Sequence, residues 1–214
     1  IGVIVGGRLG YVLFYGEGYY FQHPEQILAF NKGGMSFHGG LIGALLAGIA
    51  AAKLTRIPYL TLADLGCIGA PLGLLFGRCA NFINGELWGA PTDAAWGVVF
   101  GGAAGTMPRH PSQLYEAFLE GVVIFAVLYL LSRRMPPRPR GTFLGTFLVM
   151  YGCFRFLVEF VREPDAQLGY LWGGWLTMGQ LLSVPLILVG AGVLVYALVV
   201  KKPQKGLPEM QQSE

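Results

Sequence analysis

Charged residues are scarce in this sequence of 214 residues. Asp, Glu, Lys and Arg together make up 13% of it, against about 25% in an average globular protein. A soluble protein of this size covers its surface with polar groups, and so few charges cannot do that. With 54% hydrophobic residues and a mean hydropathy of +0.54, the composition also excludes intrinsic disorder. It indicates a polytopic membrane protein.

Cysteine is also sparse. Cys67, Cys79 and Cys153 show no CxxC spacing and no neighbouring histidine, which excludes a disulfide framework and a zinc site built from such a motif. The net charge of +3 does not come from one basic stretch, so we expect no nucleic-acid partner. We also expect no metal and no cofactor.

Six apolar segments approach the length of about 20 residues that a bilayer core requires. They cover residues 1–16, 37–53, 60–77, 114–132, 142–161 and 176–200. The predicted fold class is an all-α polytopic membrane protein with six transmembrane helices, and residues 1–202 form its helical bundle. Within it, residues 86–112, which are rich in Gly, Pro and Ala, form a small external cap. Residues 203–214 form a polar tail.

Basic residues concentrate on one side of these segments. They follow the second, fourth and sixth segments, as Lys53, Arg56, Arg133, Arg134, Arg138, Arg140, Lys201, Lys202 and Lys205. The positive-inside rule places this side, and the C-terminus, in the cytoplasm. The four tryptophans, Trp88, Trp96, Trp172 and Trp175, then lie in external segments, where interfacial tryptophan is common. Two independent patterns agree on this orientation.

Glycines recur at a spacing of four within the segments. The stripes are Gly2, Gly6 and Gly10; Gly39 and Gly43; Gly69, Gly73 and Gly77; and Gly141 and Gly145. Small residues at this spacing allow helix backbones to approach closely in a membrane. We interpret the stripes as packing surfaces.

Four ionisable side chains stand out within the apolar segments or at their ends, where charge is expensive and marks function. They are Arg8, His38, Arg78 and Arg155. Arg155 is about 20 Å from the cytoplasmic edge, counted from Thr142 at the helical rise per residue. Counting along the other segments places all four groups in the outer half of the bilayer. We therefore predict a polar site facing the outer leaflet.

Tyr151, Arg155 and Glu159 share one helix face through i, i+4 spacing, and Arg162 extends the stripe. One interpretation is an Arg155–Glu159 ion pair that satisfies itself. The other is bidentate recognition of a phosphate oxygen, which an arginine fork suits. A lipid headgroup would supply that phosphate.

Five motifs in order carry a resemblance that covers essentially the whole chain. The densest is GRCANFINGELWG at 77–89, and the others are GGMSFHGG at 33–40, HPSQLYEA at 110–117, YGCFRFLVEFVREPD at 151–165 and TMGQLLS at 177–183. Together they resemble the bacterial prolipoprotein diacylglyceryl transferases. Members of that family have seven spans. Since this chain opens at Ile1 and shows six segments, we expect the family's first helix to lie outside it.

The resemblance implies transfer of the diacylglyceryl group of phosphatidylglycerol to the lipobox cysteine of preprolipoproteins, in the bacterial cytoplasmic (inner) membrane. A thioether forms and glycerol phosphate is released. It implies catalytic roles for His38, Arg78 and Arg155. The residues implied to bind the headgroup or orient those arginines are Asn81, Glu86, Gly89, Tyr151 and Glu159. Arg8 either binds lipid phosphate or supports Glu159. His38 would take the thiol proton, and the arginines would stabilise the departing phosphate.

The motif at 110–117 also has a local explanation. Ser112 is expected to cap the fourth helix, with Gln113 and Glu116 in its first turn. His23 and His110 are expected to be interfacial or capping residues.

Three alternatives lack their chemistry. A CDP-alcohol phosphotransferase requires clustered aspartates, and Asp64, Asp93 and Asp165 are widely spaced. A rhomboid-type protease requires a GxSxG-like serine, which is missing. A channel or carrier requires polar residues through both leaflets, whereas the cytoplasmic half offers little besides Asp64.

Overall fold

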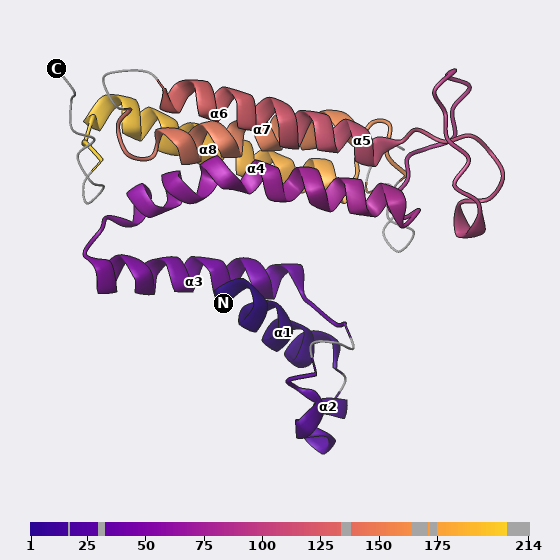
Figure 1. Cartoon of the computed structure of the whole chain (residues 1–214), viewed down its shortest axis with the longest axis horizontal. Coiled ribbons are helices and arrows are strands. Elements are labelled where there is room, and N and C mark those ends of the chain that lie inside the picture. The colour runs from indigo at the N-terminus through magenta and orange to yellow at the C-terminus, as the bar shows by residue number, and fades with distance from the viewer. Residues whose placement is uncertain (17, 30–32, 134–137, 164–170, 172–174, 205–214) are drawn as a thin grey trace. The chain divides into compact units, whose positions relative to one another are not determined.

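The computed structural model describes residues 1–16, 18–29, 33–133, 138–163, 171 and 175–204. Helices dominate this part of the chain, and isolated bridges take the place of strands in it. The chain divides into two compact units, which we call unit 1 (residues 1–62) and unit 2 (residues 63–204). Figure 1 shows the helices of each unit.

Unit 1 is built on two helices that touch through glycine. It contains α1 (Gly2–Tyr15), α2 (Tyr19–Gln22), a 3-10 turn (Pro24–Gln26), α3 (Phe37–Thr55) and the start of α4 (Tyr59–Ile83). A Cβ atom added to Gly6 would lie 2.8 Å from the Cα of Gly43, and one added to Gly10 would lie 2.8 Å from the Cα of Gly39. The close-packing interpretation of these stripes is confirmed.

Unit 2 contains the rest of α4 and three further apolar helical segments. One runs from Ser112 to Ser132 as α5 (Ser112–Glu116), a π-helical turn (Ala117–Val123) and α6 (Ile124–Ser132), and the others are α7 (Thr142–Val158) and α8 (Met178–Val200). α7 and α8 run antiparallel, since Gly145 lies against Gly190 and Leu194, whereas Gly152 lies against Ile187. Ile124, Leu128 and Phe143 form the centre of the buried core.

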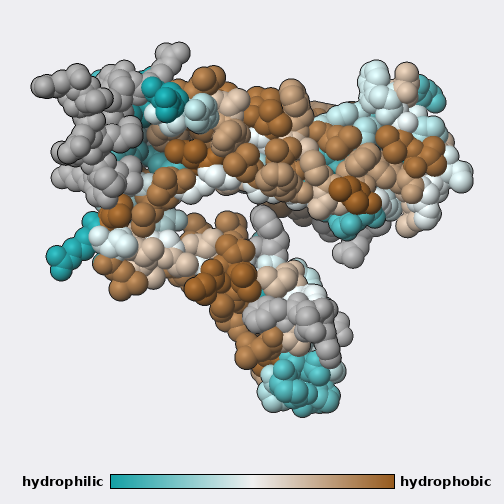
Figure 2. Space-filling model, in the orientation of Figure 1, coloured by the Kyte–Doolittle hydropathy of each residue, from teal (hydrophilic) through white to brown (hydrophobic). Residues whose placement is uncertain are grey.

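The apolar surface of these helices confirms an all-α polytopic membrane protein. In the described residues, four helices are long and apolar enough to cross a membrane: His38–Thr55, Tyr59–Ile83, Ser112–Ser132 and Met178–Val200. α1 and α7 are apolar but have only 14 and 17 residues, so the count of six spans stays a prediction. Large apolar side chains face outward along them, including Leu188 at 67% exposure. Figure 2 shows this hydrophobic surface on the helices.

Asp64 and Gly141 both have a structural role at the start of α7. Asp64 of α4 accepts hydrogen bonds from the backbone N–H of Gly141 at 2.6 Å and of Leu144 at 2.8 Å, so it caps a helix other than its own. Gly141 adopts φ 92°, which only glycine adopts easily. Its role is therefore this cap, and the packing interpretation of its stripe holds for Gly145.

The predicted cap, residues 86–112, is an irregular segment tied to the end of α7. Arg109 donates to Glu163 Oε2 at 2.6 Å and to the carbonyl of Ala104 at 2.9 Å, and its guanidinium lies 5.9 Å from the Trp88 ring. Antiparallel bridges join Gly89 to Arg162 and Arg109 to Val98. Trp96 donates from Nε1 to the hydroxyl of Tyr115 at 2.7 Å, which fixes the cap to α5. Trp172 lies outside the described residues.

Candidate active site

Three arginines and three glutamates meet inside unit 2, and we call them the arginine–glutamate cluster. They are Arg78 of α4, Glu116 of α5, Glu120 of the π-helical turn, Arg155 of α7, Glu159 at the end of α7, and Arg162. Side chains from three helical segments thus converge over a sequence separation of more than eighty residues.

α4 is longer than the segment that the sequence predicted, and its additional residues include Arg78. The predicted segment ended at residue 77, whereas the helix continues to Ile83 and so carries Arg78 inside its last turns. Gly121 brings the next helical segment against α4: a Cβ atom there would lie 2.7 Å from the Cβ of Leu75. This close approach sets Arg78 opposite Glu116 and Glu120.

Glu116 is the hub of the cluster. Its Oε2 lies 3.2 Å from Nε of Arg78, and its Oε1 lies 3.1 Å from Nη1 of both Arg155 and Arg162. The side chain is fully buried. A buried carboxylate requires such partners, because its desolvation is otherwise very costly. Three guanidinium groups compensate this one.

The capping explanation for the 110–117 motif is therefore wrong. Pro111 occupies the N-cap position of α5. Ser112 donates from Oγ to the carbonyl of Leu87 at 3.1 Å, and Gln113 donates from Nε2 to the carbonyl of Glu86 at 2.6 Å. Both side chains hold the segment that follows α4, which is a contact between distant parts of the chain that helix-cap rules do not consider.

Glu159 connects Arg155 to the start of α8. Its Oε2 lies 2.5 Å from Nη1 of Arg155, which confirms the i, i+4 pair, and its Oε1 accepts the Thr177 hydroxyl at 2.9 Å. Thr177 is the N-cap of α8 and forms a capping box with Gln180. Gly179 leaves room for the carboxylate, because a Cβ atom there would lie 2.6 Å from Cδ of Glu159. Arg162 was expected beside Glu159, but it pairs with Glu116.

Two arginines of the cluster are more exposed than its glutamates. The Arg78 and Arg155 side chains retain 16% and 17% exposure, whereas Glu116 and Glu120 have 0% and Glu159 has 6%. Tyr151 lies one turn before Arg155 on α7 and stacks on Phe147 at 5.8 Å. Two partly exposed arginine side chains that buried carboxylates hold in place suit a phosphate oxygen.

The GRCANFINGELWG motif folds back on itself at the end of α4. Asn81 and Asn84 donate from Nδ2 to Oε1 of Glu86, at 2.8 and 3.3 Å. These hydrogen bonds hold the pKa of Glu86 below its usual value, since they stabilise the carboxylate. Leu87 has φ 57°, so the chain turns sharply after Glu86. Asn81 and Glu86 therefore belong to one local motif beside Arg78.

Gly89 sits where three backbone segments cross. Its N–H donates to the carbonyl of His110 at 2.9 Å, and it bridges Arg162. A Cβ atom at this position would lie 2.6 Å from the carbonyl oxygen of Val161 and 2.7 Å from that of His110. Only glycine fits at this position. Its partner in the backbone bridge, Arg162, belongs to the arginine–glutamate cluster.

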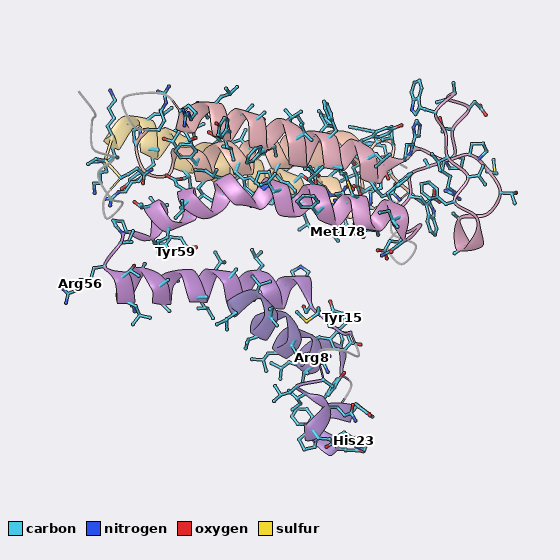
Figure 3. All side chains as sticks on the ribbon, viewed as in Figure 1. Arg8, Tyr15, His23, Arg56, Tyr59 and Met178 are labelled. Carbon is cyan, nitrogen blue, oxygen red and sulfur yellow. The ribbon has the colours of Figure 1, made fainter. Side chains whose placement is uncertain are left out.

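Arg8 and His38 belong to unit 1. Arg8 lies on α1 (Figure 3) and is 2% exposed. It donates to the backbone carbonyls of Gln26, Ile27, Gly33 and Gly34 at 2.6–3.1 Å, in the chain that follows α2. These bonds favour a structural role for it over binding of lipid phosphate. His38 lies in the first turn of α3 with an exposed side chain, and Ser36 caps that helix. Their convergence with Arg78 and Arg155 stays a prediction.

Sequence reasoning missed Glu116, Glu120 and Arg162 as members of the site. A signal for two of them existed: carboxylates at i and i+4 inside an otherwise apolar segment of spanning length. The local capping explanation for Glu116 obscured it. Arg162 was placed on the stripe that contains Arg155 and Glu159, but Glu116 was not predicted as its partner.

Apolar helices around a buried cluster of arginines and glutamates define a polytopic membrane protein with a polar site inside its bundle. The profile of the prolipoprotein diacylglyceryl transferase family matches residues 1–196, and the chain belongs to this family. A phosphatidylglycerol–prolipoprotein diacylglyceryl transferase of Geobacter sulfurreducens is 54% identical over 206 residues, which cover 96% of this chain and 76% of that protein. Proteins of the same name in Methylococcus capsulatus and Azotobacter vinelandii are each 54% identical over 197 residues, covering 92% of this chain and 74% of theirs.

Proposed function

We propose that this transferase moves the diacylglyceryl group of phosphatidylglycerol to the thiol of the lipobox cysteine in preprolipoproteins, the first step of lipoprotein maturation. Membership of the family supports the reaction. The observation that carries the mechanism is the partial exposure of the Arg78 and Arg155 side chains, both of which pair with the fully buried Glu116. A phosphodiester headgroup bound to these side chains would be held by two guanidinium groups whose geometry is already fixed.

The reaction exchanges one bond at a glycerol carbon. His38 takes the proton of the cysteine thiol, because a thiol is only slightly ionised at neutral pH. The thiolate attacks the glycerol carbon that bears the phosphate, and a thioether bond forms. The carbon–oxygen bond breaks, its electron pair stays on the phosphate oxygen, and glycerol phosphate leaves. Arg78 and Arg155 stabilise the charge that develops on that oxygen.

The remaining assigned residues act on the arginines or the headgroup. Glu159 orients Arg155 through its ion pair, and Thr177 fixes Glu159. Asn81 and Glu86 shape the turn beside Arg78, and Tyr151 offers a hydroxyl one turn from Arg155. Bidentate guanidinium contacts are the main source of specificity for phosphate in this arrangement.

We place the protein in the bacterial inner membrane, with its active site toward the outer leaflet and its C-terminus in the cytoplasm. The concentration of Lys and Arg on the opposite side from the tryptophan-containing cap supports this orientation. Its partners are then membrane phosphatidylglycerol and exported lipobox precursors. Cysteines that replace Lys202 and Thr106 should be labelled from the cytoplasmic and external sides respectively, and labelling from one side would contradict it.

A peptide assay tests the proposed activity. The purified protein is incubated with phosphatidylglycerol and a lipobox peptide, and the peptide is then weighed by mass spectrometry. We expect the mass of one diacylglyceryl group to be added and glycerol phosphate to appear in equal amount. A matched peptide with Ser in place of the lipobox cysteine should gain no mass. Flux of ions without peptide modification would instead support a channel.

A further inference from the structure

Glu120 is the least compensated charge in the arginine–glutamate cluster. Its side chain is fully buried, and neither carboxylate oxygen has a hydrogen-bond partner in the described part of the chain. Its cation contact is with Nη2 of Arg78 at 3.6 Å. Glu116, by comparison, meets three guanidinium groups at 3.1–3.2 Å, and Glu159 has both Arg155 and a hydroxyl donor.

The local backbone directs Glu120 into the site. It lies in the π-helical turn Ala117–Val123, one turn after Glu116 on the same face. Such turns occur mostly within α-helices and frequently at functional sites. The charged and titratable groups around Glu120 are Glu116 on its own helical segment, Arg78 on α4, Tyr151 and Arg155 on α7, and Arg162 beyond α7.

The charges of the cluster balance before any lipid binds. Arg78, Arg155 and Arg162 contribute three positive charges, and Glu116, Glu120 and Glu159 contribute three negative charges when ionised. A phosphodiester adds one negative charge to a site with little exposure to water, where an uncompensated charge is costly. One proton taken from water restores the balance. The favoured acceptor of this proton is the carboxylate that would lose the fewest contacts on protonation, which is Glu120.

We propose that Glu120 takes up a proton when the phosphodiester of phosphatidylglycerol binds at Arg78 and Arg155, so that lipid binding is coupled to protonation of this residue. The inference rests on the proposed function, because it takes phosphatidylglycerol as the ligand. The proton comes from water and returns to it when the phosphate product leaves. Glu120 is thus a charge-balancing residue that acts beside the arginines and makes no bond to the reacting atoms.

The coupling has a definite sign. A site that binds one more proton in the complex than in the free protein holds the lipid more tightly as the pH falls. As the pH rises through the range in which free Glu120 is ionised, affinity decreases, at most about tenfold per pH unit for one proton. A glutamine at this position keeps the shape and is always neutral. Its affinity should therefore not vary with pH in this range.

Calorimetry measures the proton directly. Short-chain phosphatidylglycerol is titrated into the purified protein in detergent, at one neutral pH, in two buffers of different ionisation enthalpy. The difference in heat gives the number of protons taken up. We expect uptake approaching one proton for the unmodified protein and near zero for Glu120→Gln, which should bind at least as tightly. Glu163→Gln, which removes an arginine-paired carboxylate outside the cluster, should retain the uptake.

Three results would decide against the proposal. Binding without proton uptake by the unmodified protein overturns it, and this measurement needs no variant if Glu120→Gln does not fold. Undiminished uptake by a folded Glu120→Gln assigns the proton to another group. Absence of phosphatidylglycerol binding at any pH contradicts the proposed function itself, and the inference falls with it.

Discussion

Replacing Glu116 by glutamine removes the charge that holds three guanidinium groups together. One carboxylate oxygen lies 3.2 Å from Nε of Arg78, and the other lies 3.1 Å from Nη1 of both Arg155 and Arg162. The glutamate side chain is fully buried. An amide nitrogen in place of either oxygen would face a guanidinium donor. Breaking a buried ion pair by removing one partner costs about 3–5 kcal/mol. We expect stability to fall by that amount, and transfer activity to fall at least tenfold, because Arg78 and Arg155 lose their shared support.

Thermal unfolding followed by tryptophan fluorescence measures the first effect. A loss of about 3–5 kcal/mol corresponds to a midpoint lower by about 6–20 °C in a protein of this size. Glu163→Gln is the matched control: its carboxylate also pairs with an arginine but is 44% exposed, so its loss should cost less than about 1 kcal/mol. A Glu116→Gln protein with a normal midpoint and normal turnover would refute the hub role.

Three further substitutions test separate parts of the site and scaffold. Arg155→Lys keeps the charge but loses the planar fork, so kcat should fall at least about tenfold, and near-normal turnover would leave only a point-charge role. Gly89→Ala places a Cβ atom 2.6 Å from the Val161 carbonyl oxygen, and the overpacking should lower stability by about 1–3 kcal/mol in thermal unfolding; an unchanged midpoint would contradict the crossing geometry. Asp64→Asn weakens the cap of α7 and should cost about 1–3 kcal/mol, with activity per folded molecule retained; loss of activity without loss of stability would place Asp64 in the site instead.

The helices could be predicted from the sequence because apolar length and glycine spacing are local signals. Each predicted segment contains a helix, and the glycines of α1 and α3 meet as their spacing predicted. The packing prediction fails for Gly69, Gly73 and Gly77 of α4, since a Cβ atom at any of them would meet no atom within 4 Å in the described part of the chain. Local signals misplaced the end of α4, where the sequence becomes polar. α4 continues past residue 77 to Ile83, and Asn81 in its last turn donates to Glu86 beyond the helix.

The partners inside the site could be predicted only in part. Arg155 and Glu159 pair within one helix, so their spacing was sufficient. Glu116 pairs with Arg78, Arg155 and Arg162 across the bundle, and no spacing rule relates residues so far apart in the sequence. Gly89 is similar: its need for glycine comes from His110 and Val161, two segments that only the fold brings together. Tertiary contacts, which a single sequence does not encode locally, account for these differences.

The effect of a chelator and of Arg78→Ala on kcat tests the arginine mechanism most directly. In the peptide assay, activity should survive excess EDTA, since the charge of the departing phosphate is met by guanidinium groups. Arg78→Ala should lower kcat by about a hundredfold or more, with a smaller change in KM, because the contact strengthens as the phosphate gains charge. Full inhibition by EDTA that added Mg²⁺ reverses, or an Arg78→Ala enzyme with unchanged kcat, would contradict the account.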